Sequence, residues 1–131
     1  MKKLPSHISR KSQLQLWIKF ILKAHELITT KSNGPNYILP TTPQKLESIV
    51  TSSLNYYDSP KQKALSLFYL IIKDHPFLNA NKRTAVAVLL FLFDYWKLGT
   101  SPDAHTLKDI SLKIAKGEPS LNEMFEYFSV S

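Results

Sequence analysis

The sequence has no cysteine and no long apolar run. The absence of cysteine excludes a disulfide framework and a thiolate metal site, and it is compatible with a reducing compartment. The longest apolar run covers residues 85–93 and is well short of the roughly 20 residues that a membrane-spanning helix needs. The basic N-terminus is not followed directly by the apolar core of a signal peptide. These absences predict a soluble, cytoplasmic protein with no membrane partner.

Strand signals and repeats are missing as well. No segment shows the sustained alternation of a β-strand, an internal repeat or low complexity. Apolar residues make up 44% of the chain and charged residues 21%, which indicates a globular protein rather than a disordered one. A length of 131 residues is sufficient for one sizeable core, so we expect a single domain over residues 1–131.

Positive charge is concentrated near the N-terminus. The formal net charge is +7, and residues 1–31 contribute +6 of it, from seven Lys and Arg against one acid, Glu26. Such a segment suits an acidic partner or nucleic acid, or it is simply a solvated face. No aromatic interleaving or nucleic-acid motif accompanies the charge, so a solvated face is favoured and nucleic acid is not expected. A nucleic-acid site would involve the most N-terminal cations, which are Lys2, Lys3, Arg10 and Lys11.

Apolar periodicity and helix start signals predict an all-α protein, a compact bundle of about six helices. The first helix is expected over residues 12–30, where an apolar stripe includes one histidine. The stripe consists of Leu14, Trp17, Ile18, Ile21, Leu22, His25 and Ile28. Further helices are expected over residues 43–54 and 61–73, through the apolar run to residue 98, and over residues 103–116 and 119–128.

Several of these helices have recognisable ends. Thr42 and Ser59 are each followed by proline, which is typical of an N-cap before the first helical position. Gly99 and Gly117 are expected to end the helices that precede them. The stretch of residues 31–43 contains three prolines and a glycine and is expected to be a loop.

The sequence HPFLNANKRT, residues 75–84, stands immediately before the apolar run. It places polar and charged side chains on a loop and on the first turn of a helix whose body is expected to be core. A helix N-terminus has unpaired backbone N–H groups and partial positive charge, which suit phosphate. Lys82 and Arg83 add two cations there, and His75 is close enough upstream to act as a base. The stretch therefore predicts a site for phosphate chemistry.

Residues of this stretch also have purely structural interpretations. Cations in the first turn oppose the helix dipole, which costs a few tenths of a kcal/mol to about 1 kcal/mol, so two of them are easier to explain if an anion binds. Asn81 either contacts phosphate or is the N-cap, and Phe77 is expected to anchor the loop to the core. The alternatives are surface charge for Lys82 and Arg83, and a bond to a local carbonyl for His75.

The same stretch resembles the signature of the Fic/Doc (Fido) family, written roughly H-x-F-x-[D/E]-[A/G]-N-[K/G]-R, and in particular its death-on-curing (Doc) toxin branch. The matching positions are His75, Phe77, Ala80, Asn81, Lys82, Arg83 and Thr84. The resemblance implies a helical Fido fold over essentially the whole chain. It implies that His75 and Arg83 are catalytic, with His75 activating a target hydroxyl. Arg83, Lys82 and Asn81 would then bind ATP phosphates, and Ala80 would allow the backbone to approach the nucleotide.

One position departs from the family pattern. Asn79 stands where the family normally has Asp or Glu, the residue that helps to hold Mg²⁺ between the nucleotide phosphates. An amide oxygen is a weaker ligand for a hard cation than a carboxylate. Three outcomes are open at this metal position: reduced activity, metal bound with help from elsewhere, or a domain that binds nucleotide without turnover.

The residue after Asn81 bears on the type of transfer. Fic enzymes that transfer AMP typically read G-N-G-R, with a glycine where this chain has Lys82, and carry Arg or Gly at a later position where it has Val86. The resemblance to Doc implies a kinase that moves the γ-phosphate of ATP to a threonine hydroxyl of elongation factor Tu and arrests translation. The alternatives are an AMP-transferase, and a weakened or inactive Fido domain that acts as a binding protein because of Asn79.

The resemblance also implies a protein partner. Doc toxins are inhibited by an antitoxin segment that folds as a helix in a groove on the toxin, which is an ordinary mode of helix recognition. The inhibitory pattern S/T-x-x-x-E-G-N/S of many Fic proteins is not found in this sequence, so inhibition is expected from another chain. The remaining histidines, His7, His25 and His105, are expected to be structural.

Overall fold

The computed structural model describes residues 10–31 and 38–128, and in these ranges it contains six α-helices and no strand. The helices are α1 (Arg10–Lys31), α2 (Thr42–Tyr56), α3 (Pro60–Asp74), α4 (Asn81–Tyr95), α5 (Ala104–Ala115) and α6 (Leu121–Tyr127). The prediction of an all-α protein with about six helices is confirmed. Lys2, Lys3, His7 and residues 32–37 of the expected loop over residues 31–43 lie outside the described residues. No described helix is long and apolar enough to cross a bilayer.

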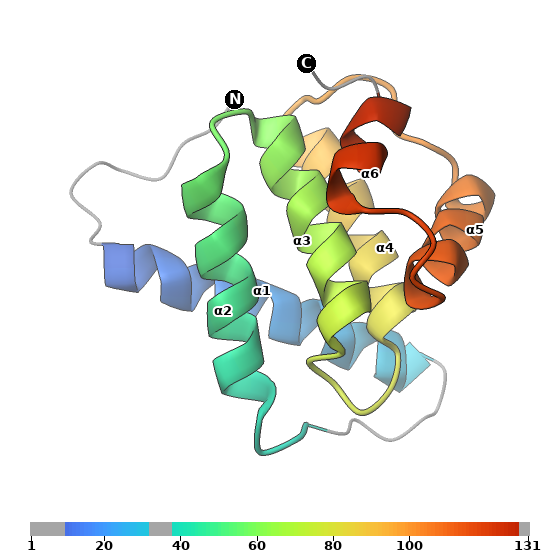
Figure 1. Cartoon of the computed structure of the whole chain (residues 1–131). Coiled ribbons are helices and arrows are strands. Elements are labelled where there is room, and N and C mark those ends of the chain that lie inside the picture. Colours follow the sequence, from blue (N-terminus) through green and yellow to red (C-terminus); the bar gives the residue numbers. More distant parts are fainter. Residues whose placement is uncertain (1–9, 32–37, 129–131) are drawn as a thin grey trace.

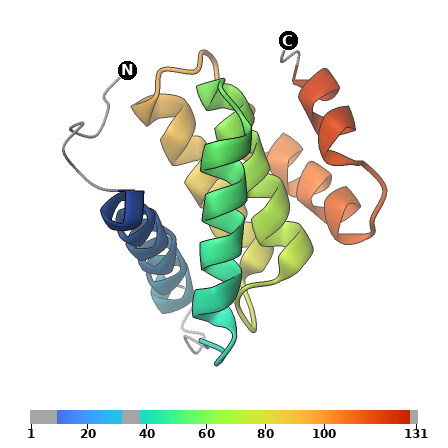
Figure 2. The same cartoon turned by 60° about the vertical axis from the view of Figure 1, so that its left-hand side comes forward.

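The helices α3 and α4 lie side by side at the centre of the bundle (Figures 1 and 2). α1 packs against α4, and α2 packs against both α1 and α3. α5 contacts both central helices from the other side, and α6 contacts α3. The loop that joins α3 to α4 lies at one end of the bundle (Figure 1).

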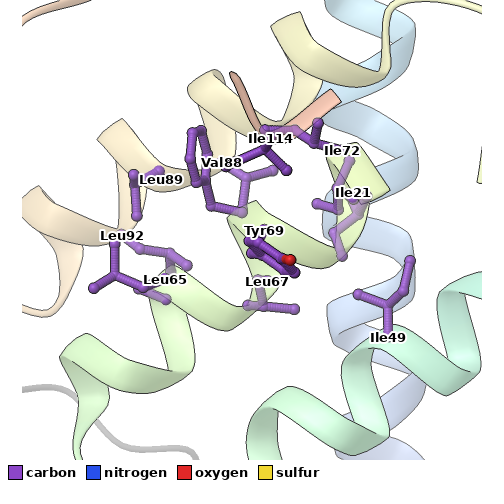
Figure 3. Packing of buried hydrophobic residues seen from close by; sticks show 14 of the residues in the cluster. Ile21, Ile49, Leu65, Leu67, Tyr69, Ile72, Val88, Leu89, Leu92 and Ile114 are labelled. Carbon is purple, nitrogen blue, oxygen red and sulfur yellow. The ribbon is translucent and has the colours of Figure 1, made fainter. Parts of the chain in front are cut away.

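The core is formed by the apolar faces of the central pair and of the helices around it (Figure 3). α3 is buried almost all round, and every residue from Ala64 to Tyr69 is buried. α4 is buried along one face through Val88, Leu89 and Leu92. The apolar run of α4 is therefore not wholly core, because the side chain of Phe91 is 47% exposed. Burying apolar surface in this way is the main stabilising contribution to a fold of this size.

α3 starts at its predicted signal, and α5 and α6 start within two residues of the expected positions. Ser59 accepts a hydrogen bond from the backbone of Gln62 at 3.4 Å at the start of α3. The backbone N–H of Thr106 donates to Asp103 at 2.8 Å, and this bond holds the pKa of the Asp103 carboxyl below its usual value. α6 begins with a capping box, in which the Ser120 backbone N–H donates to a glutamate oxygen at 2.9 Å, so Pro119 precedes the N-cap instead of opening the helix.

Two predicted ends are wrong. Thr41, not Thr42, is the N-cap of α2, and the buried hydroxyl of Thr42 bonds to the carbonyl of Pro76 instead. α4 ends at Tyr95, before the expected glycine, and Lys97 is the left-handed residue, with φ of 54°. The N–H of Leu98 donates to the carbonyl of Phe93 at 2.9 Å, which closes the helix as a Schellman motif with half-buried Leu98 packed against the core.

Candidate functional site

Residues 75–80, here called the motif loop, join the C-terminus of α3 to the N-terminus of α4 (Figure 1). The loop has a left-handed residue at each boundary: His75, with φ of 48°, is the C-cap of α3, and Ala80, with φ of 59°, is the N-cap of α4. This conformation costs roughly 1–2 kcal/mol for a residue other than glycine. Contacts from the rest of the molecule must therefore hold the loop in this shape.

Asn81 holds the middle of the loop. Its side-chain carbonyl accepts a hydrogen bond from the backbone N–H of Phe77 at 3.0 Å, and its side-chain N–H donates to the Phe77 carbonyl at 2.9 Å. The interpretation of Asn81 as the N-cap is wrong, since it is the first residue of α4 and the cap is Ala80. The ring of Phe77 is buried, as expected for an anchor.

The first half of the loop is held by α2. The Thr42 hydroxyl donates to the carbonyl of Pro76. The Lys45 ammonium donates to the carbonyls of Asp74 at 3.1 Å and His75 at 3.4 Å. These carbonyls end α3, so the lysine also has a favourable interaction with the negative end of the helix dipole. The sequence does not predict either contact, because it identifies Thr42 only as a cap signal and Lys45 only as a polar helix residue.

The second half of the loop is held by His25 of α1, whose side chain is fully buried. Its ring is stacked on that of Phe77, with centroids 3.8 Å apart and an interplanar angle of 6°. Its Nε2 atom is 3.1 Å from the carbonyl oxygen of Asn79. Because a carbonyl only accepts, this nitrogen carries the hydrogen. His25 is structural, as expected, but what it packs on is the motif loop; the signal for this was a polar residue within the apolar stripe of α1.

The start of α4 carries the two predicted cations. Lys82 is half-buried and Arg83 is exposed, and among the described residues neither side chain makes an ion pair or hydrogen bond. α4 has no side-chain cap, and its first helical hydrogen bond runs from Thr84 N–H to the carbonyl of Ala80 at 2.9 Å. Backbone N–H groups before Thr84 thus have no partner within the helix. Together with the cations, they form a surface that suits an anion.

The structure places the predicted site residues at the same end of the bundle. His75 is exposed at the start of the motif loop, Asn79 is half-buried near its end, and Lys82 and Arg83 follow on α4. Asn81 is near them, but its amide bonds the loop backbone. The polar side chains of the site therefore stand around a loop whose backbone is held from three helices.

The oxygen donors of the site are neutral. Residues 75–84 contain no carboxylate, and no cluster of three or more His, Asp or Glu suited to a metal ion occurs in the part of the chain that the structure describes. Mg²⁺ prefers charged oxygen ligands and keeps several waters. This donor set does not fit a site in which the chain itself holds Mg²⁺, and the position of Asn79 contributes at most an amide oxygen.

A second feature lies toward the other end of α4, where a groove of about 830 Å³ opens between α1, α2 and α4. We call it the aromatic groove. Its apolar lining is Leu14, Leu16, Trp17, Phe20, Val50, Leu54, Phe91, Tyr95 and Trp96. Four of its rings are in contact as pairs, with centroid separations of 4.9 Å for Phe20–Phe91 and 5.3 Å for Trp17–Trp96. Lys11, Lys63 and Asp58 also line it.

Comparison with known families gives a match to the model of the Fic/DOC family over residues 11–93. The matched region covers more than half of the chain and runs from α1 almost to the end of α4. It includes the motif loop, both cations and His25. No curated protein matches the chain.

Proposed function

The chain belongs to the Fic/DOC family of Fic-type transferases, and on this premise we propose that it is a Doc-like toxin of a toxin–antitoxin pair. Its reaction is transfer of the γ-phosphate of ATP to a threonine hydroxyl of a translation factor that resembles elongation factor Tu, which arrests translation. The observation that carries this proposal is the uncapped start of α4 with Lys82 and Arg83 in its first turn.

ATP phosphates fit this helix start for three reasons. The free backbone N–H groups of the first turn donate to phosphate oxygens. The planar guanidinium of Arg83 offers two parallel N–H donors, and Lys82 supplies a mobile positive charge. An anion here also offsets the unfavourable interaction of both cations with the helix dipole. Lys82 favours γ-phosphate transfer over AMP transfer, because AMP-transferring relatives typically have glycine at this position.

His75 is the base in the proposed reaction. Its exposed ring can accept a proton from a threonine hydroxyl of the target. The hydroxyl oxygen forms a bond to the γ-phosphorus, the bond from that phosphorus to the bridging oxygen of ADP breaks, and the proton goes to His75. Most of the acceleration comes from positioning and charge neutralisation, as is usual for phosphoryl transfer.

Asn79 supports a second candidate, a weakened or inactive Fido domain that binds nucleotide or protein without turnover. The neutral donor set of the loop favours this candidate, because the chain supplies no carboxylate for the metal of a Mg²⁺–ATP substrate. In the kinase proposal the nucleotide phosphates and water would supply most of the ligands of Mg²⁺. An Asn79→Asp variant separates the two, since added charge raises transfer in a weakened enzyme and leaves an inactive one inactive.

The proposed partner is an antitoxin helix in the aromatic groove. The groove is lined mainly by apolar side chains, as grooves that accept the apolar face of a helix are. Lys11 and Lys63 line it, and the chain as a whole has a net charge of +7. An amphipathic helix with acidic flanks is therefore the complementary partner, whereas the basic N-terminus of this chain or a second copy of it would bring like charge.

The deciding experiment incubates purified protein with bacterial lysate, Mg²⁺ and ATP labelled at either the γ- or the α-phosphate. We expect a protein to be labelled from the γ-position alone. His75→Ala should abolish labelling, whereas His105→Ala, which removes an exposed histidine from α5, should not. Transfer from the α-position would make the protein an AMP-transferase. Absence of both labels in the native protein and in Asn79→Asp would favour the binding protein.

A further inference from the structure

His25 lies on α1, 54 residues before the part of the motif loop that it contacts. We infer that it is a positioning residue for the site: it sets the second half of the motif loop by stacking on Phe77 and by donating a hydrogen bond to Asn79. The inference deepens the proposed function and rests on it, because the loop that His25 holds carries the proposed base and the metal position.

The hydrogen bond is the reason to have histidine here. The position is in the apolar stripe of α1 and is fully buried, so an apolar side chain would fill it without a polar atom to satisfy. In the described structure the second ring nitrogen, Nδ1, is buried without a hydrogen-bond partner. A phenylalanine would avoid that cost and keep the stack on Phe77. What it would lose is the bond from Nε2 to the Asn79 carbonyl, at 3.1 Å.

This bond adds to the contacts that fix the loop backbone. Thr42 and Lys45 hold the carbonyls of its first half, and Asn81 holds both backbone groups of Phe77. The bond from His25 reaches the Asn79 carbonyl, directly before left-handed Ala80. Without it one bond that fixes the orientation of the Asn79 peptide is lost, and we expect the side chains of the loop to hold a less exact position relative to the start of α4.

Loss of the His25 bond should affect the rate of phosphate transfer more than the affinity for ATP. Lys82, Arg83 and the N–H groups proposed to bind phosphate belong to α4, which packs mainly against α3 and not through His25. ATP affinity should therefore change little. The rate of transfer depends on how the loop residues stand against the bound phosphate, and small misplacements cost on the order of 10- to 100-fold.

Two substitutions separate the ring stack of His25 from its hydrogen bond. His25→Phe keeps an aromatic ring for the stack and removes the donor. His25→Gln removes the ring and keeps an N–H donor with a similar reach. Ile21→Val is the control, because it trims a fully buried residue one turn earlier on α1 without removing a hydrogen bond. For each variant we would measure kcat and KM for ATP, the thermal midpoint, and the amide resonance of Ala80, whose nitrogen shares the peptide bond with the Asn79 carbonyl.

We expect His25→Phe to lower kcat by 10- to 100-fold with KM for ATP nearly unchanged, and to shift the Ala80 amide resonance. His25→Gln should retain more of both properties. The inference is overturned if His25→Phe keeps the native kcat and Ala80 resonance. It is also overturned if Ile21→Val loses kcat in the same proportion, since the effect would then follow stability.

The spectra keep this inference separate from the proposed function. If the native protein transfers no phosphate, the Ala80 resonance in the variants still reports whether His25 holds the loop. If His25→Phe does not fold, the ring nitrogens of native His25 decide. A hydrogen on Nε2 that is protected from exchange supports the inference, and a ring protonated on Nδ1 alone overturns it.

Discussion

α4 begins at Asn81 with two cations in its first turn and no side-chain cap, and it ends at Tyr95 beside exposed aromatic rings. The first end is held by polar contacts from α1 and α2, whereas the groove at the second is formed by apolar side chains of the same helices. The same helix thus presents a surface that suits an anion at one end and an apolar surface at the other. On the proposed function, the nucleotide and the protein partner would bind at separate places, which substitutions at each end can test.

The largest effect is expected from Arg83→Ala at the first end. Loss of a charge-assisted hydrogen bond should weaken ATP binding by about 1.5 to 3 kcal/mol, or on the order of 10- to 100-fold in Kd. The same change removes a cation from a helix N-terminus and should raise the free energy of unfolding by about 0.3 to 1 kcal/mol. Calorimetric titration with ATP and thermal denaturation measure the two opposite effects.

Lys113→Ala is the matched control. Lys113 is an exposed cation in the last turn of α5, where it interacts favourably with the negative end of the helix dipole. It should leave ATP binding unchanged and lower stability slightly. Native-like ATP affinity in Arg83→Ala would mean that the start of α4 is not the phosphate site.

A smaller effect is expected from Phe91→Ser at the second end. Phe91 is 47% exposed and its ring contacts those of Phe20 and Tyr95. Loss of a central aromatic contact should weaken binding of a helical partner by about 1 to 2 kcal/mol, roughly 5- to 30-fold. The probe is a fluorescent amphipathic helical peptide with acidic flanks, and its anisotropy gives the affinity. ATP binding should not change.

Leu112→Ser is the comparison variant, since Leu112 is a similarly exposed apolar residue on α5, outside the groove. It should bind the peptide as the native protein does. The partner proposal fails if a peptide with basic flanks binds as well as the acidic one, or if Phe91→Ser leaves the affinity unchanged.

The smallest effect concerns two left-handed residues that flank α4. Ala80→Gly and Lys97→Gly should each raise the free energy of unfolding by roughly 0.5 to 1 kcal/mol, because relief of the left-handed strain exceeds the backbone entropy that glycine loses on folding. Chemical denaturation measures this gain. Only Ala80→Gly should also change the rate of phosphate transfer, since Ala80 ends the motif loop. A loss of stability in either variant would contradict the strain argument.

The sequence predicts much of the fold because its signals are local. Ser59 caps α3 as predicted, α5 begins directly after the expected residue 103, and Gly117 ends α5 with φ of 79°. The end of α4 was not predictable in this way. Lys97 takes the left-handed position because Leu98 packs on the core, and that packing depends on neighbouring helices.

For the site, the sequence by itself determined the motif, its place before a buried helix and the two cations of the first turn, because all of these lie within ten consecutive residues. Only the tertiary structure decided which side chains hold the loop. The bonds from His25 and Thr42 join residues 54 and 34 positions apart. Periodicity places His25 on the apolar stripe of α1, and Thr42 is recognisable only as a cap signal. Which backbone groups they reach depends on how α1 and α2 pack against the central pair.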